Sequence, residues 1–360
     1  MIPWSGPGAL LGSMGQATWR LGRLIRRVSL PILLVCSTAR ALADPDPAAV
    51  RKMWSPFVEP LAAKPEEREP RSELVSLGRH LFFERALSPD RARSCNDCHD
   101  LSRYGTNGDA VEDLRKAGKL RRDVPSLYNL GGLKLFGWDA RKKDLRSYTA
   151  AALTSPEESA LRDPAVVVER LEATPAYRER FAAAFEGGRR ITFDRVVAAL
   201  TAFQEGLVTP APFDAFLAGD DQALTAEQLK GAVIFDQKNC SACHTGSAIG
   251  GQMIQIAGIM KPWPNQDDLG HFEVTKKPAH KLAFRVPPLR NVAKTGPYFH
   301  DHSARSLRRA IRDIAFLEQG MNLDLDEIIA IEAFLESFTG KLPEEYIQAP
   351  GGAVRPPGDR

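Results

Sequence analysis

The sequence predicts an all-α fold with two domains built on one pattern. A motif of two cysteines and a histidine, C-x-x-C-H, occurs twice, at Cys95, Cys98, His99 and at Cys240, Cys243, His244. Before each copy, in "LGRHLFF" and "LKGAVIF", a glycine stands four residues ahead of a phenylalanine. Similarity that extends beyond the motif indicates one domain type used twice. The stretch between the motifs has helical periodicity and helix-start signals, so we expect helices there.

Residues 1–43 are predicted to be a signal peptide. Four arginines between positions 20 and 27 precede the apolar run "VSLPILLVCST", and "ALA" at 41–43 fits a small-x-small cleavage site. The mature chain is therefore expected to begin at Asp44, in the periplasm. An uncleaved membrane anchor is the alternative, but Pro31 and the shortness of the apolar run disfavour it.

Charge argues against nucleic-acid binding. The 360-residue chain is 43% hydrophobic, which is enough to bury a core. Loss of the signal peptide removes five arginines and no acidic residue, leaving 43 basic against 45 acidic residues. A chain so nearly balanced has no electrostatic footprint for a nucleic acid.

The four cysteines of the mature chain all lie in the two motifs, because Cys36 belongs to the signal peptide. A disulfide or a four-cysteine zinc site would use the thiols and leave both histidines without a role. Covalently attached haem c uses all six residues, since two thiols bind the vinyl groups and the histidine ligates the iron. The sequence thus favours two haem c groups, with His99 and His244 as iron ligands; zinc and disulfides are the alternatives.

Helix-start signals place the elements of the first domain, predicted over 44–207. Ser155, Pro156 and Glu158 form a capping box that opens one helix, and the pair Asp163-Pro164 opens another. In "TFDRVVAALTAFQEGL", 192–207, four apolar residues share one helical face: Val196, Val197, Leu200 and Phe203.

The second domain is predicted over 208–345. Two prolines in "VTPAPFD", 208–214, indicate the linker that enters it. Thr225 with Gln228 caps the helix that leads to the second motif. "LDEIIAIEAFLESFTG" predicts a last amphipathic helix that stops at Gly340, and the tail 346–360 is expected to be frayed.

The chain resembles the bacterial dihaem cytochrome c peroxidase family, which includes the MauG-type enzymes. The resemblance covers residues 73–343. It rests on the two motifs, on "DVPSLYN" and "GWDARKKDL" after the first, and on "FRVPPLRNVAKTGPYFHD" and "EAFLESFTGKLP" after the second. It implies two cytochrome c-like haem domains packed together. The N-terminal haem, on His99, would bind and cleave peroxide, and the C-terminal haem, on His244, would receive electrons.

The resemblance also implies two catalytic side chains. Trp138 matches the tryptophan that relays electrons between the haems, although a packed core tryptophan is the plainer interpretation. Glu158 matches the distal glutamate that moves a proton as the O–O bond breaks. It is also the third helical residue of the capping box, and Glu157 is the fallback.

Calcium and partners are further implications of the resemblance. Asp123 and the backbone carbonyls of Thr295 and Pro297 match a calcium site between the domains, and oxygen donors suit that ion. Electrons would come from a small cytochrome c or copper protein. By analogy alone, a homodimer is expected.

The chain departs from the family at both irons. No histidine lies between His99 and His244, and Arg115 stands where many family peroxidases place a capping histidine, which favours an open, MauG-type iron. At the second haem, the expected methionine or tyrosine ligand is replaced by Ile314, which cannot ligate iron. Other residues able to provide a sixth ligand are Met253, Met260, Met321, His271, His280 and His302.

Three functions follow, in order of preference. The first is a periplasmic peroxidase that reduces hydrogen peroxide to water. The second uses peroxide to oxidise residues of a partner protein, as MauG-type enzymes do. The third is a non-catalytic dihaem electron carrier.

Overall fold

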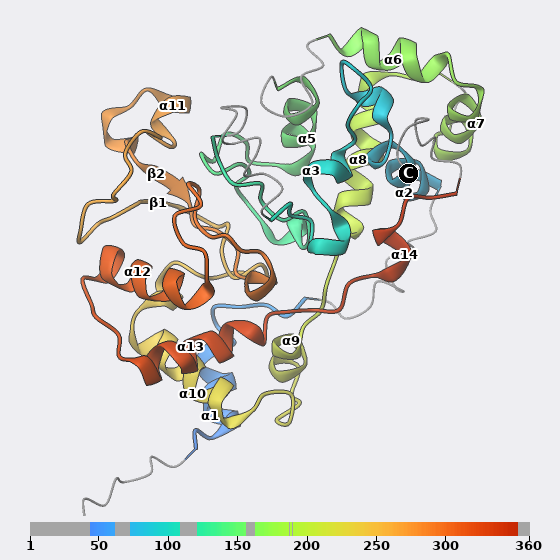
Figure 1. Ribbon diagram of the computed structural model, residues 1–360. Helices are drawn as coiled ribbons and strands as arrows, with labels where there is room; N and C mark the ends of the chain where they lie inside the picture. Colours follow the sequence, from blue (N-terminus) through green and yellow to red (C-terminus); the bar gives the residue numbers. More distant parts are fainter. Residues whose placement is uncertain are drawn as a thin grey trace, which may run out of the picture. The chain divides into compact units, whose positions relative to one another are not determined.

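The computed structural model describes residues 44–61, 73–108, 121–155, 163–186, 188 and 190–351 (Figure 1). This part of the chain is mostly helical, as predicted. The longer helices are α1 (Pro47–Trp54), α2 (Glu73–Phe82), α5 (Leu145–Thr154), α6 (Pro164–Glu172), α7 (Pro175–Ala184), α8 (Phe193–Gly206), α10 (Ala226–Gln237), α12 (Leu307–Gln319) and α13 (Leu325–Glu336). The shorter ones are α3 (Cys95–Cys98), α9 (Pro212–Leu217), α11 (Phe272–Thr275) and α14 (Glu344–Ile347).

One feature of the fold is not helical. Strands β1 (Ile254–Ile256) and β2 (Ala283–Arg285) form an antiparallel pair in which Ile254 lies opposite Arg285. No helix in the described part of the chain is long and apolar enough to cross a membrane.

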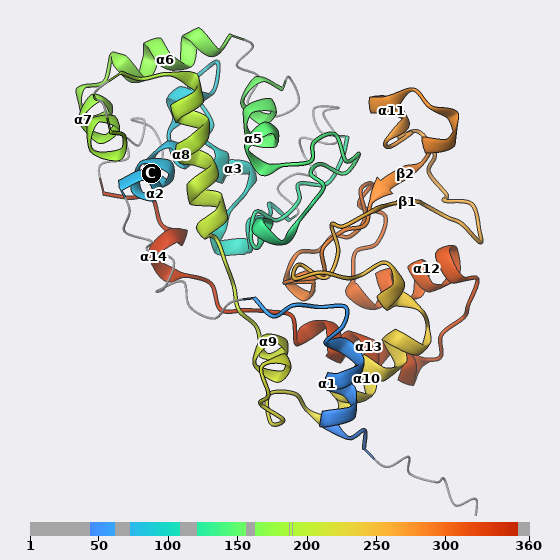
Figure 2. The ribbon, with the colours of Figure 1, turned by 180° about the vertical axis from the view of Figure 1, so that it is seen from behind.

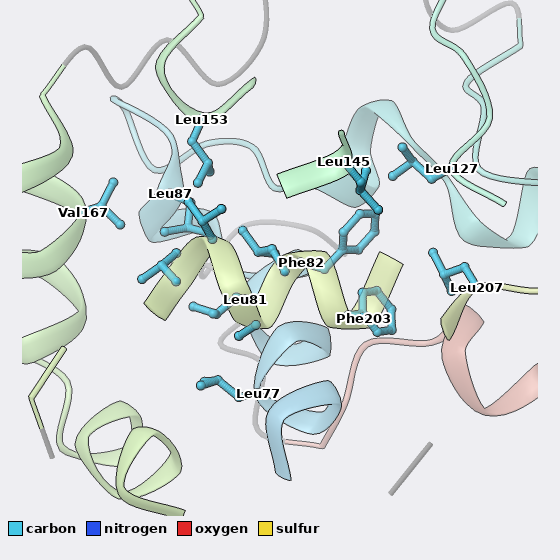
Figure 3. Close-up of a cluster of buried hydrophobic side chains, with 14 of the residues drawn as sticks. Leu77, Leu81, Phe82, Leu87, Leu127, Leu145, Leu153, Val167, Phe203 and Leu207 are labelled. Carbon is cyan, nitrogen blue, oxygen red and sulfur yellow. The ribbon is translucent and has the colours of Figure 1, made fainter. Parts of the chain in front are cut away.

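The first hydrophobic core forms around the crossing of α2 and α8 (Figure 3). The predicted apolar face of α8 is buried, and Phe203 packs at 5.4 Å from the ring of Phe82. A Cβ atom on Gly78 would collide with the carbonyl oxygen of Ala199 and lie 2.7 Å from Cβ of Phe203. The glycine of the repeated pattern therefore allows two helix backbones to touch.

The second core repeats this arrangement with α10 and α13. A Cβ atom on Gly231 would collide with the carbonyl oxygen of Ala330 and lie 2.8 Å from Cβ of Phe334. In both pairs, a glycine of the helix that leads to the motif meets an alanine and, one turn later, a phenylalanine. The glycine repeated in the sequence thus has the same role in both halves, since it allows two helix backbones to touch.

Several predicted helix starts are confirmed. Asp163 accepts a hydrogen bond from the backbone N–H of Ala165 and Pro164 is the first residue of α6, while Thr225 and Gln228 form the predicted capping box of α10. The predicted capping box at Ser155 extends into residues outside the described ranges.

The last long helix ends earlier than predicted. Helix α13 stops at Glu336, with Ser337 as its C-cap, four residues before Gly340. Gly340 has another task, because a Cβ there would collide with the carbonyl oxygen of Thr209. The glycine permits a close approach of two chain segments rather than ending the helix.

Both ends of the described chain pack where the sequence analysis did not place them. Val50 and Trp54 of α1 belong to the core of the second half, where Trp54 contacts Phe213 at 5.6 Å. Tyr346, placed by the sequence in a frayed tail, is 4% exposed and packs in the core of the first half. Figures 1 and 2 show α1 beside α10 and α14 beside α2. The two ends therefore cross over, because each carries an aromatic side chain that completes the other half's core.

A buried threonine joins the two halves. The hydroxyl of Thr209, in the predicted linker, accepts hydrogen bonds from the side-chain amides of Asn129 at 2.8 Å and Asn291 at 2.9 Å. Both asparagines follow the repeated V-P-x-L segment and adopt left-handed backbone conformations. The linker is thus a buried hub rather than an exposed connection.

Candidate haem sites

The first C-x-x-C-H motif is held by a single helical turn. Ser94 and Asp97 cap α3, and the backbone N–H of Ser94 donates to the Asp97 carboxylate at 2.6 Å. This turn places the thiols of Cys95 and Cys98 on successive levels of one helix face. His99 follows at once, so its imidazole lies beside the two thiols.

Hydrogen bonds fix the imidazole of His99. Its Nδ1 lies 3.2 Å from the carbonyl oxygen of Gly105 and 3.1 Å from that of Pro125. Carbonyl oxygens only accept, so Nδ1 carries the proton and the Nε2 lone pair is available for a metal. Burial also lowers the pKa of His99 to about 4, which keeps the ring neutral as ligation requires.

The second motif repeats these contacts. Nδ1 of His244 lies 3.2 Å from the carbonyl oxygen of Ile249, and the carbonyl of Pro287 is a second acceptor. Burial lowers the pKa of His244 to about 4 and raises that of the Cys240 thiol to about 12. Pro125 and Pro287 hold matching places in V-P-x-L, so the repeated segment supplies the carbonyl that orients each histidine.

A cavity gathers the first motif and Trp138. Its wall includes Cys95, Cys98 and His99 together with Trp138. Its apolar lining includes Phe82, Leu87, Leu127, Leu153 and Leu200. Its charged lining consists of Arg93, Arg121, Arg122, Asp123 and Arg141. The structure therefore brings the predicted tryptophan to the first motif, from a segment 40 residues along the chain.

The residues around this cavity fit a haem c. Apolar walls suit the faces of a porphyrin, the thiols suit its vinyl groups, and the arginines suit its carboxylates. Arg285, next to Gly137 of the cavity wall, is 3% exposed, donates from Nε to the carbonyl of Gly137 at 3.1 Å, and has a buried Nη1 without a partner among the described residues. Burial lowers the pKa of Arg285 to about 10. A buried guanidinium of this kind indicates that an anion belongs beside it.

Neither alternative to haem has a matching geometry. The four cysteine side chains are thiols rather than disulfides. Within the described ranges, no group of three or more His, Cys, Asp and Glu side chains is arranged to hold a metal ion. A four-cysteine zinc site would require such a group, whereas each haem needs only one histidine from the chain as its proximal ligand.

Trp138 lies at a junction of the two halves. Its Nε1–H donates to the backbone carbonyl of Asp123 at 2.9 Å, and its own carbonyl accepts from the backbone N–H of Arg285 at 2.8 Å. Its ring centroid is 6.3 Å from that of His300 in the second half. This position suits the predicted relay, whose operation stays a prediction.

The structure shows contacts for two of the predicted calcium ligands, Asp123 and Thr295. Burial raises the pKa of Asp123 well above its usual range, and its carboxylate lies 3.6 Å from Nδ1 of His302. The hydroxyl of Thr295 donates to the carbonyl of Val292 at 3.4 Å, and Pro297 follows a cis peptide bond. Calcium therefore stays a prediction. The sequence analysis named His302 only as a candidate iron ligand and missed its place beside Asp123.

The candidates for a sixth ligand at the second haem are scattered. Met253 and Met260 are 40% and 57% exposed. His271 hydrogen-bonds through Nδ1 to the carbonyl of Asp139 at 2.7 Å, and its ring lies 4.9 Å from that of His280. None of these contacts involves His244, and the sixth ligand stays unassigned.

An ion-pair network beside the cavity was missed from the sequence. Arg122 donates to the carboxylates of Asp139 and Asp268, each at 2.6 Å, and Arg141 also binds Asp139 at 2.8 Å. Hydrogen bonds from these arginines keep the pKa of Asp139 low even though burial opposes it. Only Arg141 and Asp139 are near in sequence, within "GWDARKKDL", so a pattern could have indicated just that pair.

Three predicted site residues lie outside the described ranges. These are Glu157, Glu158 and Arg115. Their roles stay predictions from the resemblance.

Comparisons with known proteins find similar sequences over most of the chain. Residues 72–222 match the family described as "Di-haem cytochrome c peroxidase", and residues 228–339 match "Cytochrome c". Cytochrome c551 peroxidase of Nitrosomonas europaea is 35% identical over 290 residues, which cover 80% of this chain and 85% of that protein. Methylamine utilization protein MauG of Methylorubrum extorquens is 32% identical over 280 residues, covering 77% and 78%.

A solved structure shares the fold. A MauG-like protein associated with microbial copper homeostasis superposes with a TM-score of 0.65 at 24% identity, covering 82% of this chain and 96% of that one. The prediction of two cytochrome c-type domains is thus confirmed.

Proposed function

We propose a peroxidase function for this chain, which belongs to the di-haem cytochrome c peroxidase/MauG family of haem enzymes. In this proposal it reduces hydrogen peroxide to water in the periplasm, with two electrons taken one at a time from a small cytochrome c or copper protein. The observation that carries the proposal is the cavity in which Cys95, Cys98, His99 and Trp138 meet.

The chain's own residues supply position, protons and an electron path. A haem held by Cys95, Cys98 and His99 would supply the redox chemistry by which peroxide is reduced. His99 presents a neutral imidazole held by two carbonyls. Glu158 would move the proton between the two peroxide oxygens. Trp138, bonded through its main chain to Arg285 of the second half, would deliver the electrons.

Periplasmic location and calcium are parts of the proposal with separate support. The signal-like residues 1–43 support export, as do the two haem attachment motifs. Asp123, Thr295 and Pro297 support calcium by their match to the family. Metal analysis of the purified protein, before and after chelation, tests the calcium.

Outward oxidation of a partner protein is the second candidate. No histidine lies between His99 and His244, so the chain offers no histidine in the place that caps the resting iron in many family members. A MauG protein is also among its relatives at 32% identity. In this candidate, oxidising equivalents leave through Trp138 and the second haem.

One titration separates the candidates. One equivalent of hydrogen peroxide is added to the fully ferric holoprotein while the haem absorption spectrum is followed. An immediate change favours outward oxidation, and a change only after one haem has been reduced favours the reductively activated peroxidase. No change in either state would leave the electron carrier and remove the proposed function.

A further inference from the structure

A tryptophan that the sequence analysis did not single out lies on a chain of aromatic rings that starts at Trp138. The ring of His300 is 6.3 Å from that of Trp138, and the ring of Trp263 is 5.6 Å from that of His300. Phe284 stacks on His300 at 4.0 Å and fixes its plane. Electron tunnelling weakens steeply with distance, so two short steps are favoured over one long step. The two steps here connect tryptophans that come from segments 125 residues apart.

We propose that Trp138, His300 and Trp263 form a branch that carries oxidising equivalents from the first haem site to the surface at residues 261–267. The inference rests on the proposed function, since peroxide supplies the oxidant. It names a route other than the one through the second haem, with Trp263 as its terminal redox residue.

The hydrogen bonds of the two tryptophans favour this direction. Oxidation makes an indole N–H strongly acidic. Nε1–H of Trp138 donates to the backbone carbonyl of Asp123, which cannot take the proton at neutral pH. Nε1–H of Trp263 donates to Oδ2 of Asp301 at 2.9 Å, and a carboxylate can take it. The oxidised state is therefore more stable on Trp263, as a neutral radical, than on Trp138, as a cation.

Trp263 lies just below the surface. Its side chain is 3% exposed, whereas the flanking residues are exposed: Lys261, Pro262, Pro264, Asn265, Gln266 and Asp267. The indole is thus shielded from water, while the chain on both sides of it is exposed and open to a surface-bound molecule. The one-electron donor of the proposed function, a small cytochrome c or copper protein, would be oxidised there when docked over residues 261–267.

The electrons and protons of the branch balance. Oxidised Trp138 takes one electron from Trp263 and returns to its closed-shell form, while the indole proton of Trp263 passes to Asp301. The surface donor then gives one electron to Trp263, and Asp301 returns the proton. Two such passages supply the two electrons that, with two protons from solvent, convert one hydrogen peroxide into two water molecules.

The test uses the ferric holoprotein with deuterated tryptophan and one equivalent of hydrogen peroxide. Samples are frozen at intervals for electron paramagnetic resonance, and the haem spectrum is recorded in parallel. Trp54 provides the matched control, because it is a tryptophan 1% exposed in the second core whose Nε1 has no hydrogen-bond partner among the described residues. We expect the neutral indole radical in the wild type and in Trp54→Phe. In Trp263→Phe we expect that radical to be lost, because oxidation then stops at Trp138 as a cation, with the haem change present in all three.

A second variant keeps the inference open to refutation if Trp263→Phe fails to fold. Asp301→Asn removes the proton acceptor, so the hyperfine pattern should change from that of a neutral indole radical to that of a cation. A wild-type radical that survives Trp263→Phe, or an unchanged pattern in Asp301→Asn, overturns the branch while leaving the peroxidase intact. Absence of any haem change in the wild type overturns the proposed function and the branch with it.

Discussion

The two halves of this molecule share a skeleton and differ in what surrounds their histidines. Each half packs a glycine of one helix against an alanine of another, and each orients its histidine with the carbonyl of a V-P-x-L proline. The first half adds a cavity lined by Trp138 and several arginines. The second half has Ile314 where the resemblance predicts an iron ligand. The shared features fit a haem-binding domain, and we propose that the differences around the two histidines give each half its own task.

The strongest test of this division of roles replaces His99 and His244 by glycine, one at a time. We expect His99→Gly to reduce the response to stoichiometric peroxide by about 100-fold or more, because a first-half ligand is lost. His244→Gly should retain that response and lose turnover with an external donor. Stopped-flow absorbance measures both, and added imidazole should restore part of each. Equal loss of the peroxide response in the two variants would contradict the division of roles.

Glu158→Gln tests whether the first half alone carries acid–base chemistry. The peroxide step should slow by about 10²–10⁴-fold, since a positioned proton carrier contributes that much. Glu157→Gln is the matched control and should remain within a few-fold of the wild type. Haem content and the resting spectrum should not change in either. An unaltered rate in Glu158→Gln would remove the assigned role.

The shared skeleton predicts equal sensitivity at its two glycines. Gly78→Ala and Gly231→Ala should each lower the free energy of unfolding by about 3 kcal/mol, because a methyl group is forced against a helix backbone. Gly131→Ala serves as control, since a Cβ there meets no atom within 4 Å. Urea unfolding of the holoprotein gives the three values. A clear difference between Gly78→Ala and Gly231→Ala would show that the two helix crossings are not equivalent.

The smallest expected effect concerns the hub that joins the halves. Thr209→Val leaves the buried amides of Asn129 and Asn291 without their shared acceptor and should cost about 2 kcal/mol of unfolding free energy. Thr201→Val is the control, because that hydroxyl donates to a carbonyl within its own helix, at 2.7 Å. Thermal unfolding of the two variants gives the comparison. A cost no larger at Thr209 than at Thr201 would argue against the hub.

Local patterns were enough to predict the elements that depend on neighbouring residues. The C-x-x-C-H motifs, the start of α6 at Pro164 and the capping box at Thr225 all involve residues a few positions apart. The prediction that the last helix reaches Gly340 was wrong, because that glycine is required by its contact with Thr209, which is distant in sequence. The partners of Arg122 and the burial of Arg285 also arise from tertiary contacts. The resemblance, rather than periodicity, pointed to Trp138, and nothing in the pattern indicated Trp263.

The crossing of the chain ends determines when each half can fold during synthesis of the chain. Helix α1 is made near the start, yet its Trp54 packs among phenylalanines of α9, α10 and α13, which are synthesised some 160 or more residues later. The first half likewise lacks Tyr346 until almost the whole chain exists. Neither half can therefore finish folding while the chain is still emerging. A product truncated after residue 207 would expose the first core without Tyr346 and the unpacked Trp54 of α1, so we expect it to be cleared by proteases rather than to accumulate as a half-enzyme.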